Sequence, residues 1–242
     1  MNPVLILAHN CLELTKRCVE SVRKQNAHCM IEIVDNGSTD GTADWLTQEK
    51  INATHYKENL GVSKGWNDGL RWFFQKPFVA DHCLVLNNDT VIPPWFYSSL
   101  LSYDAPFVTG VSVGSMNDIL APEPPKELAP CPDFSGFLIR RECWEKVGPF
   151  DESMKLYASD LDYHIRAHRA GIRLMNAGVN FYHERSSTLN SAPPKERRNI
   201  ELQADADRER LTEKWGCTAW RESYTAMFDE KFFGIDKEVN NA

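Results

Sequence analysis

The stretch CLVLNNDTVIPPWF, residues 83–96, joins a strand-like apolar run to an abrupt polar end. The run ends in two amides and one carboxylate, Asn87, Asn88 and Asp89. Pro93 and Pro94 follow, and the strand stops here because proline is tolerated only at the edges and ends of sheets. Taken alone, this polar end is either a simple turn or a place where a metal ion meets a phosphate group.

Apolar runs similar to this one occur at several other points of the chain. We expect strands at residues 4–8, 30–34, 53–56, 82–86 and 107–113. Between them, apolar residues at helical spacing predict helices at residues 12–25, 42–49, 63–74 and 94–101. This alternation of strands and helices predicts an α/β fold with a mainly parallel sheet flanked by helices.

Three of the expected strands are followed directly by polar residues. The three strand ends are residues 8–10 (Ala8, His9 and Asn10), 35–36 (Asp35 and Asn36) and 87–89. In open α/β sheets, ligands bind beyond the carboxyl ends of the strands. We therefore expect these three groups to converge at one edge of the sheet and to form a ligand site there.

The second half of the chain has a different pattern. Residues 121–133 are rich in proline and predict an extended loop, and residues 134–152 predict a strand, a short helix and a turn. We expect a helix at residues 160–170 with Ser159 as its N-cap, and short strands at 172–176 and 180–182 that end at His183. A charged helix is expected to reach Trp215, before a tail that contains several aromatic residues.

Composition limits the class of protein. The chain has 242 residues, which fits one large α/β domain with or without a short appendage. Its net charge of −7 argues against a nucleic-acid binder, which needs a basic surface. The 7 cysteines include no Cys-x-x-Cys pair and indicate reduced thiols. No segment has the pattern of a signal peptide or a membrane span, so we expect a cytoplasmic protein without a transmembrane segment.

Two of the polar segments have more than one interpretation. Asp35 is placed to accept an N–H from a nucleobase, whereas residues 38–41 have the usual composition of a turn and helix cap. The segment NLGVSKGWNDG, residues 59–69, has neither the dinucleotide-binding nor the P-loop spacing. Its glycines let a ligand approach the backbone closely and Lys64 can reach a phosphate, but an ordinary loop before a helix explains it equally well.

A divalent cation bound together with a nucleotide diphosphate needs few protein ligands, because phosphate oxygens and water fill its other positions. Asp89 is one candidate ligand, and His183 at the end of the last expected strand is the second. A histidine combined with oxygen ligands suits Mn²⁺, and Mg²⁺ is the alternative. The competing interpretation of His183 is a structural residue that only donates or accepts hydrogen bonds.

Asp160 and Asp162 lie in the first turn of the helix expected at residues 160–170. Residues two apart on a helix do not face the same way, so the two carboxylates have different roles. We expect Asp160 to point into the cleft as a general base and Asp162 to support it. The alternative is helix-end electrostatics, with Arg166 as the partner of these carboxylates.

Together, these segments resemble family 2 glycosyltransferases with the nucleotide-sugar-binding GT-A fold. The resemblance covers residues 3–190 and rests on the order and spacing of several blocks. The blocks are PVLILAHN, IEIVDNGSTDGT, NLGVSKGWNDG, LVLNNDT, FSGFLIRRECWEKVGPFDE and SDLDYHIRAHRAG, followed by His183. Within the family, the Asn-Leu-Gly and Asn-Asn-Asp-Thr forms are most similar to rhamnosyltransferase-type members.

The resemblance implies that Asp160 is the catalytic base and that Asp89 and His183 bind the metal. Together with the residue patterns above, it gives a set of donor-binding candidates: Ala8, His9, Asn10, Asp35, Lys64, Asn67 and Asn88. Three positions depart from the family pattern. Residues 87–89 stand in place of Asp-x-Asp, Ser159 in place of a glutamate, and His9 in place of a tyrosine.

These roles predict an inverting, metal-dependent glycosyltransferase. It would move a sugar, with rhamnose or glucose as candidates, from a UDP- or dTDP-sugar to a hydroxyl group of a glycan or glycoconjugate. We expect a GT-A domain at residues 1–190, with a nucleotide-sugar-binding half (1–113) and an acceptor and catalytic half (114–190). The remainder, 191–242, is expected to be a C-terminal helical extension.

Two other classes of protein compete with this prediction. A nucleotidyltransferase shares a similar sheet and metal use, but it carries a basic glycine-rich phosphate loop near its N-terminus, and AHNCLELTKR is not such a loop. The second class is a non-catalytic nucleotide-sugar-binding module of a longer polypeptide. Membership of a multidomain glycosyltransferase is also compatible with this chain.

Overall fold

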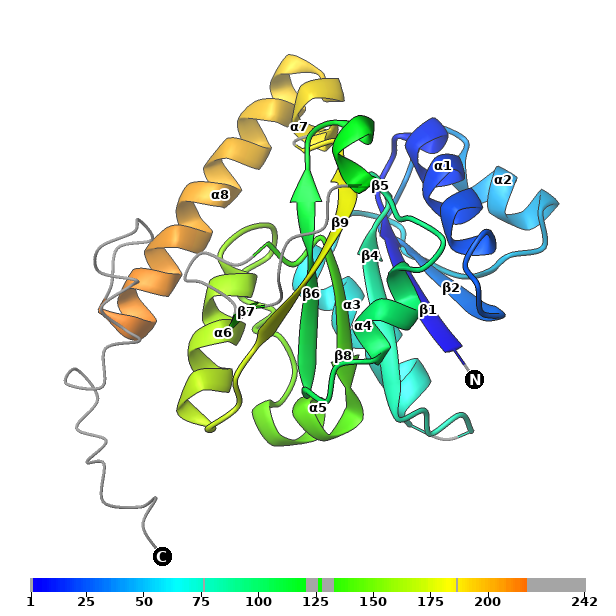
Figure 1. The fold of residues 1–242 in the computed structure, drawn as a ribbon. Helices are drawn as coiled ribbons and strands as arrows, with labels where there is room; N and C mark the ends of the chain where they lie inside the picture. The colour runs from blue at the N-terminus through cyan, green and yellow to red at the C-terminus, as the bar shows by residue number, and fades with distance from the viewer. Residues whose placement is uncertain (1, 76, 121–125, 128–132, 186, 217–242) are drawn as a thin grey trace, which may run out of the picture.

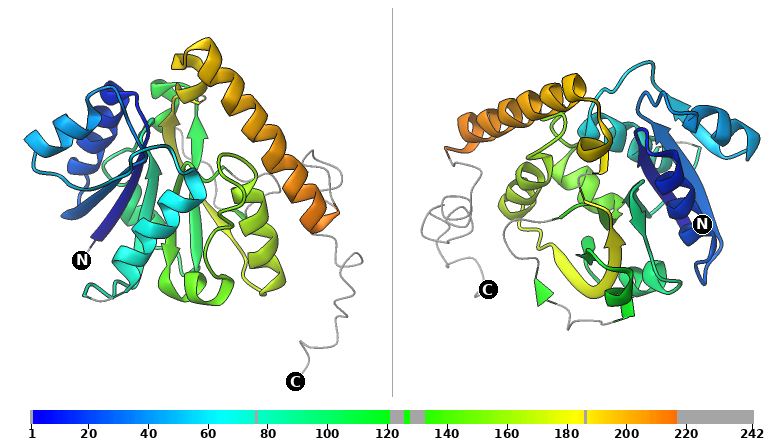
Figure 2. Two further views of the ribbon diagram at one scale, coloured as in Figure 1. Left: turned by 180° about the vertical axis from the view of Figure 1, so that it is seen from behind. Right: turned by 90° about the horizontal axis from the view of Figure 1, so that it is seen from above.

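The computed structural model describes residues 2–75, 77–120, 126–127, 133–185 and 187–216, and its architecture is α/β. One curled sheet lies between two layers of helices, as Figures 1 and 2 show. The strand order is β3-β2-β1-β4-β8-β6-β9-β5, and β7 pairs with β9. The predicted fold class, a mainly parallel sheet flanked by helices, is confirmed.

The strands are β1 (Asn2–Ala8), β2 (Cys29–Asp35), β3 (Asn52–His55), β4 (His82–Asn87), β5 (Thr90–Val91), β6 (Phe107–Val113), β7 (Lys126–Glu127), β8 (Gly136–Arg140) and β9 (Met175–His183). The helices are α1 (Leu12–Arg23), α2 (Thr42–Gln48), α3 (Val62–Phe74), α4 (Phe96–Leu101), the short 3-10 helix η1 (Met116–Leu120), α5 (Arg141–Val147), α6 (Ser159–Arg169), α7 (Ser187–Ser191) and α8 (Pro194–Trp215). β1 to β4 run parallel, whereas β8 is antiparallel between β4 and β6.

β1 shows why this sequence forms a central strand. Its side chains alternate between two hydrophobic cores, with Leu5 and Leu7 on the side of α3 and Val4 and Ile6 on the side of α1 and α4. A strand segment that is buried on both faces has to be apolar, as residues 3–8 of β1 are. The packing against α3 is close, because a Cβ atom at Gly69 would lie 2.3 Å from the Leu5 Cδ1 atom.

Two local predictions are wrong. The strands expected at 172–176 and 180–182 are one strand, β9, which passes through Gly178 at a φ of 68°. Its register against β6 shifts at this point, so a bulge absorbs the glycine and the strand continues. The helix expected from residue 160 begins at Ser159, and its N-cap is Ala158, because Ala158 has the left-handed φ of 63° that breaks the helical path.

The chain after β9 forms α7 and the long helix α8. α8 starts beside α7, near the carboxyl ends of the strands, and runs down to α6 (Figures 1 and 2). The Trp215 indole N–H donates to Asp162 of α6 at 2.9 Å, and Lys214 lies 2.8 Å from the same carboxylate. The aromatic tail and most of the proline-rich loop lie outside the described residues. Within the described part, no helix has the length and apolar character needed to cross a membrane.

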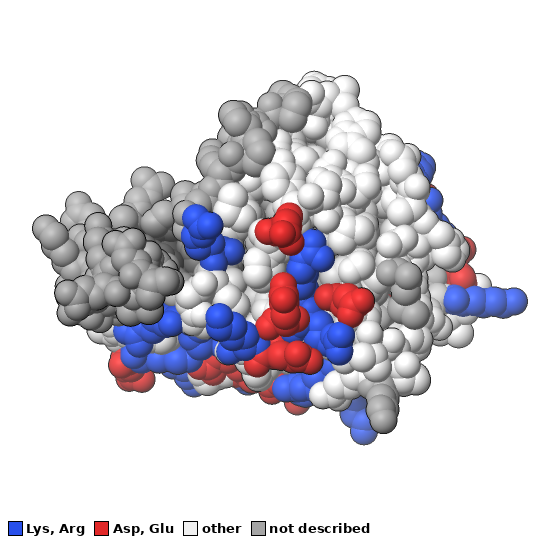
Figure 3. All heavy atoms as spheres, turned by 60° about the horizontal axis from the view of Figure 1, so that its bottom comes forward, with Lys and Arg blue, Asp and Glu red and all other residues white. Residues whose placement is uncertain are grey.

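The opposite end of the sheet has a surface of mixed charge. Figure 3 shows Lys and Arg side chains interspersed with Asp and Glu side chains on the face at the bottom of Figure 1. At this end, Asp81 before β4 and Arg141 after β8 form an ion pair of 2.9 Å. Interspersed charges of both signs are typical of a solvated surface. The carboxyl ends of the strands are therefore the better place for a ligand.

Candidate active site

The carboxyl ends of β1, β2 and β4 are tied together by hydrogen bonds. Ala8 pairs with Asp35 across β1 and β2, and the backbone N–H of Asn36 donates to the Ala8 carbonyl at 2.7 Å. The Asn88 side-chain amide donates to the Asn10 carbonyl at 2.9 Å. The three polar groups predicted from the strand ends therefore lie together at one edge of the sheet.

Asp89 and His183 also meet at this edge. β5 and β9 pair in antiparallel register, and Asp89 immediately precedes β5 while His183 ends β9. The Asp89 Oδ1 atom lies 3.4 Å from the His183 Nε2 atom. The other Asp89 oxygen accepts a hydrogen bond from the Ser187 hydroxyl at 2.7 Å. Strand pairing thus brings together two residues that are far apart in the sequence.

A second carboxylate, Asp133, lies on the other side of His183. Its Oδ2 atom is 3.6 Å from His183 Nδ1, which is too long for a hydrogen bond. The Ser135 hydroxyl bridges the gap, because it lies 3.0 Å from His183 Nδ1 and is hydrogen-bonded to Asp133 Oδ1.

The hydrogen bonds of Ser135 determine where its hydroxyl proton and the Nδ1 proton of His183 lie. An ionised carboxylate only accepts hydrogen bonds, so Ser135 donates its single proton to Asp133. Ser135 must then accept the hydrogen bond from Nδ1–H of His183. The Nε2 atom of His183 is therefore the one turned toward Asp89, as a metal-binding histidine requires.

Burial and hydrogen bonding together set the charges in this group. Burial favours a higher pKa for Asp89 and Asp133, but the hydrogen bonds that they accept and the charge of His183 hold both pKa values below the usual range. Burial also favours a lower pKa for His183, but the two carboxylates outweigh it and raise the pKa to about 9. Without a bound metal, His183 is an imidazolium between two carboxylates at neutral pH.

Asp160 lies in the first turn of α6 and within electrostatic reach of Asp133. Burial, and secondarily the negative charge of Asp133, raise the pKa of Asp160 to about 7. The backbone N–H of Leu161, which donates to Asp160 Oδ1 at 2.9 Å, acts in the opposite direction. A carboxyl group with a pKa near neutrality is suited to accept a proton from a substrate.

Asp162 faces away from Asp160 and holds helices together. It is 0% exposed and accepts hydrogen bonds from Arg166 Nε at 2.8 Å and from the Trp215 indole at 2.9 Å. These contacts join α6 to the end of α8. The two aspartates are therefore separated on the helix as expected, with Arg166 bound to Asp162.

The Asp89–His183 pair fits a hard divalent cation. Two ligands of one ion at bond lengths of about 2.1 Å lie roughly 3–3.5 Å apart, and Asp89 Oδ1 and His183 Nε2 are 3.4 Å apart. The hydrogen bond from His183 Nδ1–H to Ser135 orients the imidazole, as outer partners do for metal-bound histidines. In the described ranges, no group of three or more His, Cys, Asp and Glu side chains is arranged around a metal position.

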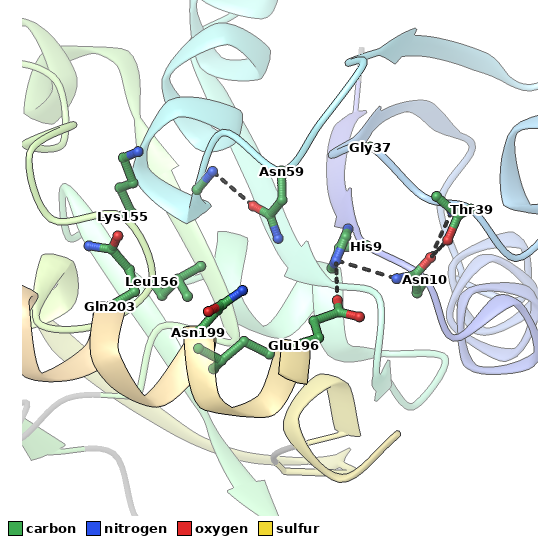
Figure 4. Close-up of a pocket in the computed structure, with 12 residues that line it drawn as sticks. His9, Asn10, Gly37, Thr39, Asn59, Lys155, Leu156, Glu196, Asn199 and Gln203 are labelled. Carbon is green, nitrogen blue, oxygen red and sulfur yellow. Dashed lines mark hydrogen bonds and ion pairs between the residues drawn. The ribbon is translucent and has the colours of Figure 1, made fainter. Parts of the chain in front are cut away.

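A cavity of about 430 Å³ opens beside these strand ends (Figure 4). Its lining comes from the ends of β1 and β2, the loops before α3 and α6, and α8, and includes His9, Asn10, Gly37, Thr39, Asn59, Lys155 and Glu196. Neither Asp89 nor His183 is among its lining residues; the cavity is connected to them through Asn10, which lines it and whose carbonyl accepts the Asn88 amide. Its volume falls within the range of roughly 300–1,000 Å³ that is usual for small-molecule sites.

Asp35 lies behind the cavity and not in its lining. It is 2% exposed, and both of its oxygens already have partners. Oδ1 accepts the backbone N–H of Ser38 at 3.0 Å, and Oδ2 lies 3.0 Å from His55 Nδ1. For Asp35 to contact a nucleobase, the partly exposed His55 side chain would therefore have to move away from Oδ2.

Lys64 and Asn67 are both engaged within the protein. The Lys64 ammonium group pairs with Asp68 of the same helix at 2.7 Å. Asn67 is 0% exposed, and its amide binds the backbone carbonyl and N–H of Phe150 at 2.9 and 2.8 Å. These two donor-binding candidates from the sequence thus bind other parts of the protein in the structure.

Two contributions to the site were not found in the sequence. Asp133 precedes β8, and because β8 is antiparallel, the start of that strand lies at the same edge as the ends of its parallel neighbours. A search for polar residues before antiparallel strands would have found it. The second contribution is α8, whose Glu196 side chain lies 3.7 Å from His9.

The sequence model of Glycosyl transferase family 2 matches residues 4–166. This segment contains Asp89, Asp133 and Asp160, and it covers more than half of the chain. The chain belongs to glycosyl transferase family 2. This family 2 glycosyltransferase is 28% identical over 180 residues to an uncharacterized protein of Mycobacterium tuberculosis. The match covers 67% of this chain and 65% of that relative, so the chain spans just under two thirds of its length.

Solved structures show that this family 2 glycosyltransferase has the GT-A fold. Staphylococcus aureus TarS, solved as residues 1–349 with UDP-GlcNAc, superposes with a TM-score of 0.59 at 16% identity, covering 89% of this chain and 73% of TarS. Glucosyl-3-phosphoglycerate synthase of Mycobacterium tuberculosis, solved with Mn²⁺, UDP and its product, superposes with a TM-score of 0.60 at 16% identity. That match covers 89% of this chain and 80% of the synthase.

The bridge formed by Ser135 predicts the effect of removing its hydroxyl group. We expect Ser135→Ala to weaken Mn²⁺ binding in the presence of UDP by about 10- to 100-fold, because the His183 imidazole loses its orienting partner. Ser135→Thr keeps a hydroxyl and should retain most of the affinity. Electron paramagnetic resonance of Mn²⁺ measures both variants, and equal affinity in Ser135→Ala and the unmodified protein would contradict the orienting role.

Proposed function

We propose that this family 2 glycosyltransferase is an inverting, metal-dependent enzyme that uses a UDP- or dTDP-sugar and a hydroxyl group of a glycan or glycoconjugate. The observation that carries the proposal is the position of Asp160 in the first turn of α6 within electrostatic reach of Asp133, where burial first and the charge of Asp133 second raise its pKa to about 7. Asp133 is bridged to His183, and His183 faces Asp89. A base, a pair of metal-type ligands and a cavity for a donor are thus combined at one sheet edge.

In the proposed reaction, Asp160 accepts the proton of the acceptor hydroxyl while that oxygen attacks the anomeric carbon of the donor. The bond from this carbon to the diphosphate breaks on the opposite face, so the configuration is inverted. A pKa of about 7 gives Asp160 both a substantial ionised fraction and useful basicity near neutral pH. Asp89 and His183 would hold a divalent cation, whose positive charge would stabilise the leaving diphosphate.

We place the nucleoside of the donor in the cavity beside His9 and Asn10, and its diphosphate toward Asp89 and His183. Asn88, which holds the Asn10 carbonyl, then lies between the two parts of the donor. Asp35 favours uracil or thymine, because its carboxylate can accept the N–H of these bases once His55 moves. TarS with UDP-GlcNAc and the mycobacterial synthase with UDP and Mn²⁺ support this choice.

The narrower assignments follow from the similarity to rhamnosyltransferase-type members. We propose rhamnose or glucose as the transferred sugar and polysaccharide or glycoconjugate synthesis as the process. We also propose that residues 1–113 bind the donor and that residues 114–190 carry the base and the acceptor surface. Of the C-terminal helical extension expected at 191–242, residues 217–242 lie outside the described residues.

Thermal shift with UDP-, dTDP- and GDP-sugars in the presence of Mn²⁺ tests the donor class. A ligand at about 100 times its Kd adds about 2.7 kcal/mol to the free energy of unfolding, which raises the Tm by several degrees. We expect this shift with UDP- or dTDP-sugars, together with slow release of the nucleoside diphosphate. Binding without any release would indicate a binding module, and release of pyrophosphate from a nucleoside triphosphate would indicate a nucleotidyltransferase.

A further inference from the structure

The face of α8 that meets the cavity is mostly polar. The lining residues recur at helical spacing and form one stripe, Glu196, Asn199, Ile200 and Gln203. Asp207 lies on the same stripe one turn further along. Figure 4 shows Glu196 and Asn199 projecting from α8 toward the wall that carries His9.

Hydrophobic packing does not explain this stripe. Of the 22 residues of α8, the buried ones are Ala204, Asp207 and Leu211. A helix that is held on a protein by packing normally presents a broad apolar stripe to it. The part of α8 that faces the cavity instead presents two amides and a carboxylate around Ile200. Such a surface is suited to a polar ligand that lies between the helix and the sheet.

Asp207 binds three consecutive backbone N–H groups of the loop before α6. Its carboxylate accepts from Lys155 at 3.1 Å, from Leu156 at 2.7 Å and from Tyr157 at 3.0 Å. Asp207 is 0% exposed, so these bonds compensate for the burial of its charge. The loop contributes Lys155 and Leu156 to the cavity wall and leads directly to Asp160.

The same loop is held on its other side by the start of α3. The Val62 N–H donates to the Lys155 carbonyl at 2.5 Å, and the Ser63 hydroxyl donates to the Met154 carbonyl at 2.8 Å. A Cβ atom at Gly61, which has a φ of 99°, would lie 2.7 Å from the Lys155 carbonyl oxygen. The loop is therefore bound to α3 on one side and to α8 on the other. A shift of α8 would move the cavity wall together with the segment that carries Asp160.

The charge of Glu196 indicates which part of a donor faces α8. A carboxylate repels a diphosphate but accepts hydrogen bonds from hydroxyl groups, and the Asn199 amide can donate and accept. The proposed cation at Asp89 and His183 offsets this repulsion, so the diphosphate belongs toward that end of the cavity. In the proposed placement the transferred sugar lies on the far side of the diphosphate, so the ribose hydroxyls and the base are the polar groups that face the stripe.

We propose that α8 is the outer wall of the donor pocket, that its polar stripe contacts the nucleoside of the bound donor, and that Asp207 is a positioning residue that couples this wall to the loop leading to Asp160. The proposal rests on the proposed donor-binding function. It assigns nucleotide recognition to a helix that lies beyond the matched residues 4–166.

The substitution Asn199→Trp tests whether α8 forms a wall of the donor pocket. Asn199 is exposed and faces the cavity, so a tryptophan there should fill the pocket without disturbing the fold. We expect the Kd for UDP in the presence of Mn²⁺, measured by calorimetry, to rise by about tenfold or more. The control is Leu202→Trp, because Leu202 is 52% exposed on the same helix and does not line the cavity.

The control variant should bind UDP within about twofold of the unmodified protein, and both variants should keep its Tm within a few degrees. Equal binding of UDP by Asn199→Trp and the unmodified protein would contradict the proposal that α8 forms the outer wall of the donor pocket. Failure of the unmodified protein to bind either UDP or dTDP would instead overturn the proposed function. The two failures are therefore distinguishable.

The substitution Asp207→Asn tests the coupling, with Asp205→Asn as its control because Asp205 is exposed on the opposite face of α8. An asparagine replaces one acceptor oxygen by an N–H donor that faces backbone N–H groups. We expect faster hydrogen exchange at residues 155–157, and a fall in kcat by about 10- to 100-fold from a displaced base. A lower Tm with unchanged kcat and unchanged KM for the donor would reduce Asp207 to a structural residue.

Discussion

Replacing Asp160 by asparagine should lower kcat for sugar transfer by about 10²- to 10⁴-fold, the range that general base catalysis contributes. Asparagine has the same shape, so it keeps the hydrogen bond from the Leu161 N–H but cannot accept a proton at neutral pH. The Kd for UDP with Mn²⁺ should stay within about twofold, because Asp160 binds neither the nucleotide nor the metal in the proposed arrangement. Steady-state kinetics and calorimetry on the same preparation separate the two effects.

Asp162→Asn is an informative comparison for Asp160→Asn. It removes a charge from the same helix, but Asp162 is bound to Arg166 and to the Trp215 indole. We expect a lower Tm for this variant and a smaller loss of kcat. Equal losses of kcat and of UDP affinity in Asp160→Asn would reject the role of Asp160 as the base.

The raised pKa of Asp160 also predicts how stability changes with pH. The pKa is about 7 in the folded protein and 3.8 for an isolated aspartate, so folding favours the protonated form. The contribution of Asp160 to the free energy of unfolding is fully present below the pKa of the unfolded state. It is lost as the pH rises through the pKa of the folded state. Asp160→Asn removes this loss. The Tm of Asp160→Asn relative to that of the unmodified protein should therefore rise as the pH increases between these two values. At higher pH this difference in Tm should stay constant.

The strand-end rule predicted much of the site from the sequence. Asp89 is recognisable because it follows an apolar run, and the parallel pairing of β1, β2 and β4 then fixes the side of the sheet on which it lies. His183 ends a strand whose sequence is interrupted by Asn176, Gly178 and Asn180. Their meeting, however, depends on the antiparallel pairing of β5 with β9, and β5 has only two residues. A strand of that length leaves no periodic pattern in a sequence.

The residues that sequence reasoning missed act through tertiary contacts. Asp133 stands just before an antiparallel strand, where a rule based on the ends of parallel strands does not reach. Asp207 is one of many acidic residues in a charged helix, and nothing local distinguishes it from the exposed Asp205. Its three backbone partners lie about fifty positions earlier in the chain, at residues 155–157.

Lys64 and Asn67 are donor-binding candidates whose side chains have partners within the protein. Both lie in a glycine-containing segment at the start of α3, which suggested contact with a donor. Lys64 has an acidic partner one helical turn away, Asp68, and salt bridges at this spacing form locally. Asn67 is buried against the Phe150 segment, whose backbone carbonyl and N–H its amide binds. A polar residue in a helix is thus ambiguous until its neighbours are known.

Replacing Asp89 by asparagine should abolish the dependence of UDP binding on Mn²⁺. In the unmodified protein the metal and the nucleotide share the site, so each should tighten the other by the same factor, as linkage requires. Asparagine keeps an oxygen that can accept the Ser187 hydroxyl, but it removes the one carboxylate that faces His183 Nε2. We expect kcat to fall by about 10²- to 10³-fold or more, because the developing charge on the diphosphate loses its counter-charge.

The single carboxylate of residues 87–89 makes the linkage measurement decisive. With Asp89 and His183 as its ligands among the described residues, Mn²⁺ alone should bind weakly, and most of its affinity should depend on the diphosphate oxygens. Titration of Mn²⁺ with and without UDP should therefore show a coupling of about tenfold or more in the unmodified protein and none in Asp89→Asn. Tight binding of Mn²⁺ without UDP, or coupling that persists in Asp89→Asn, would place the metal elsewhere and leave the Asp89–His183 pair as a structural contact.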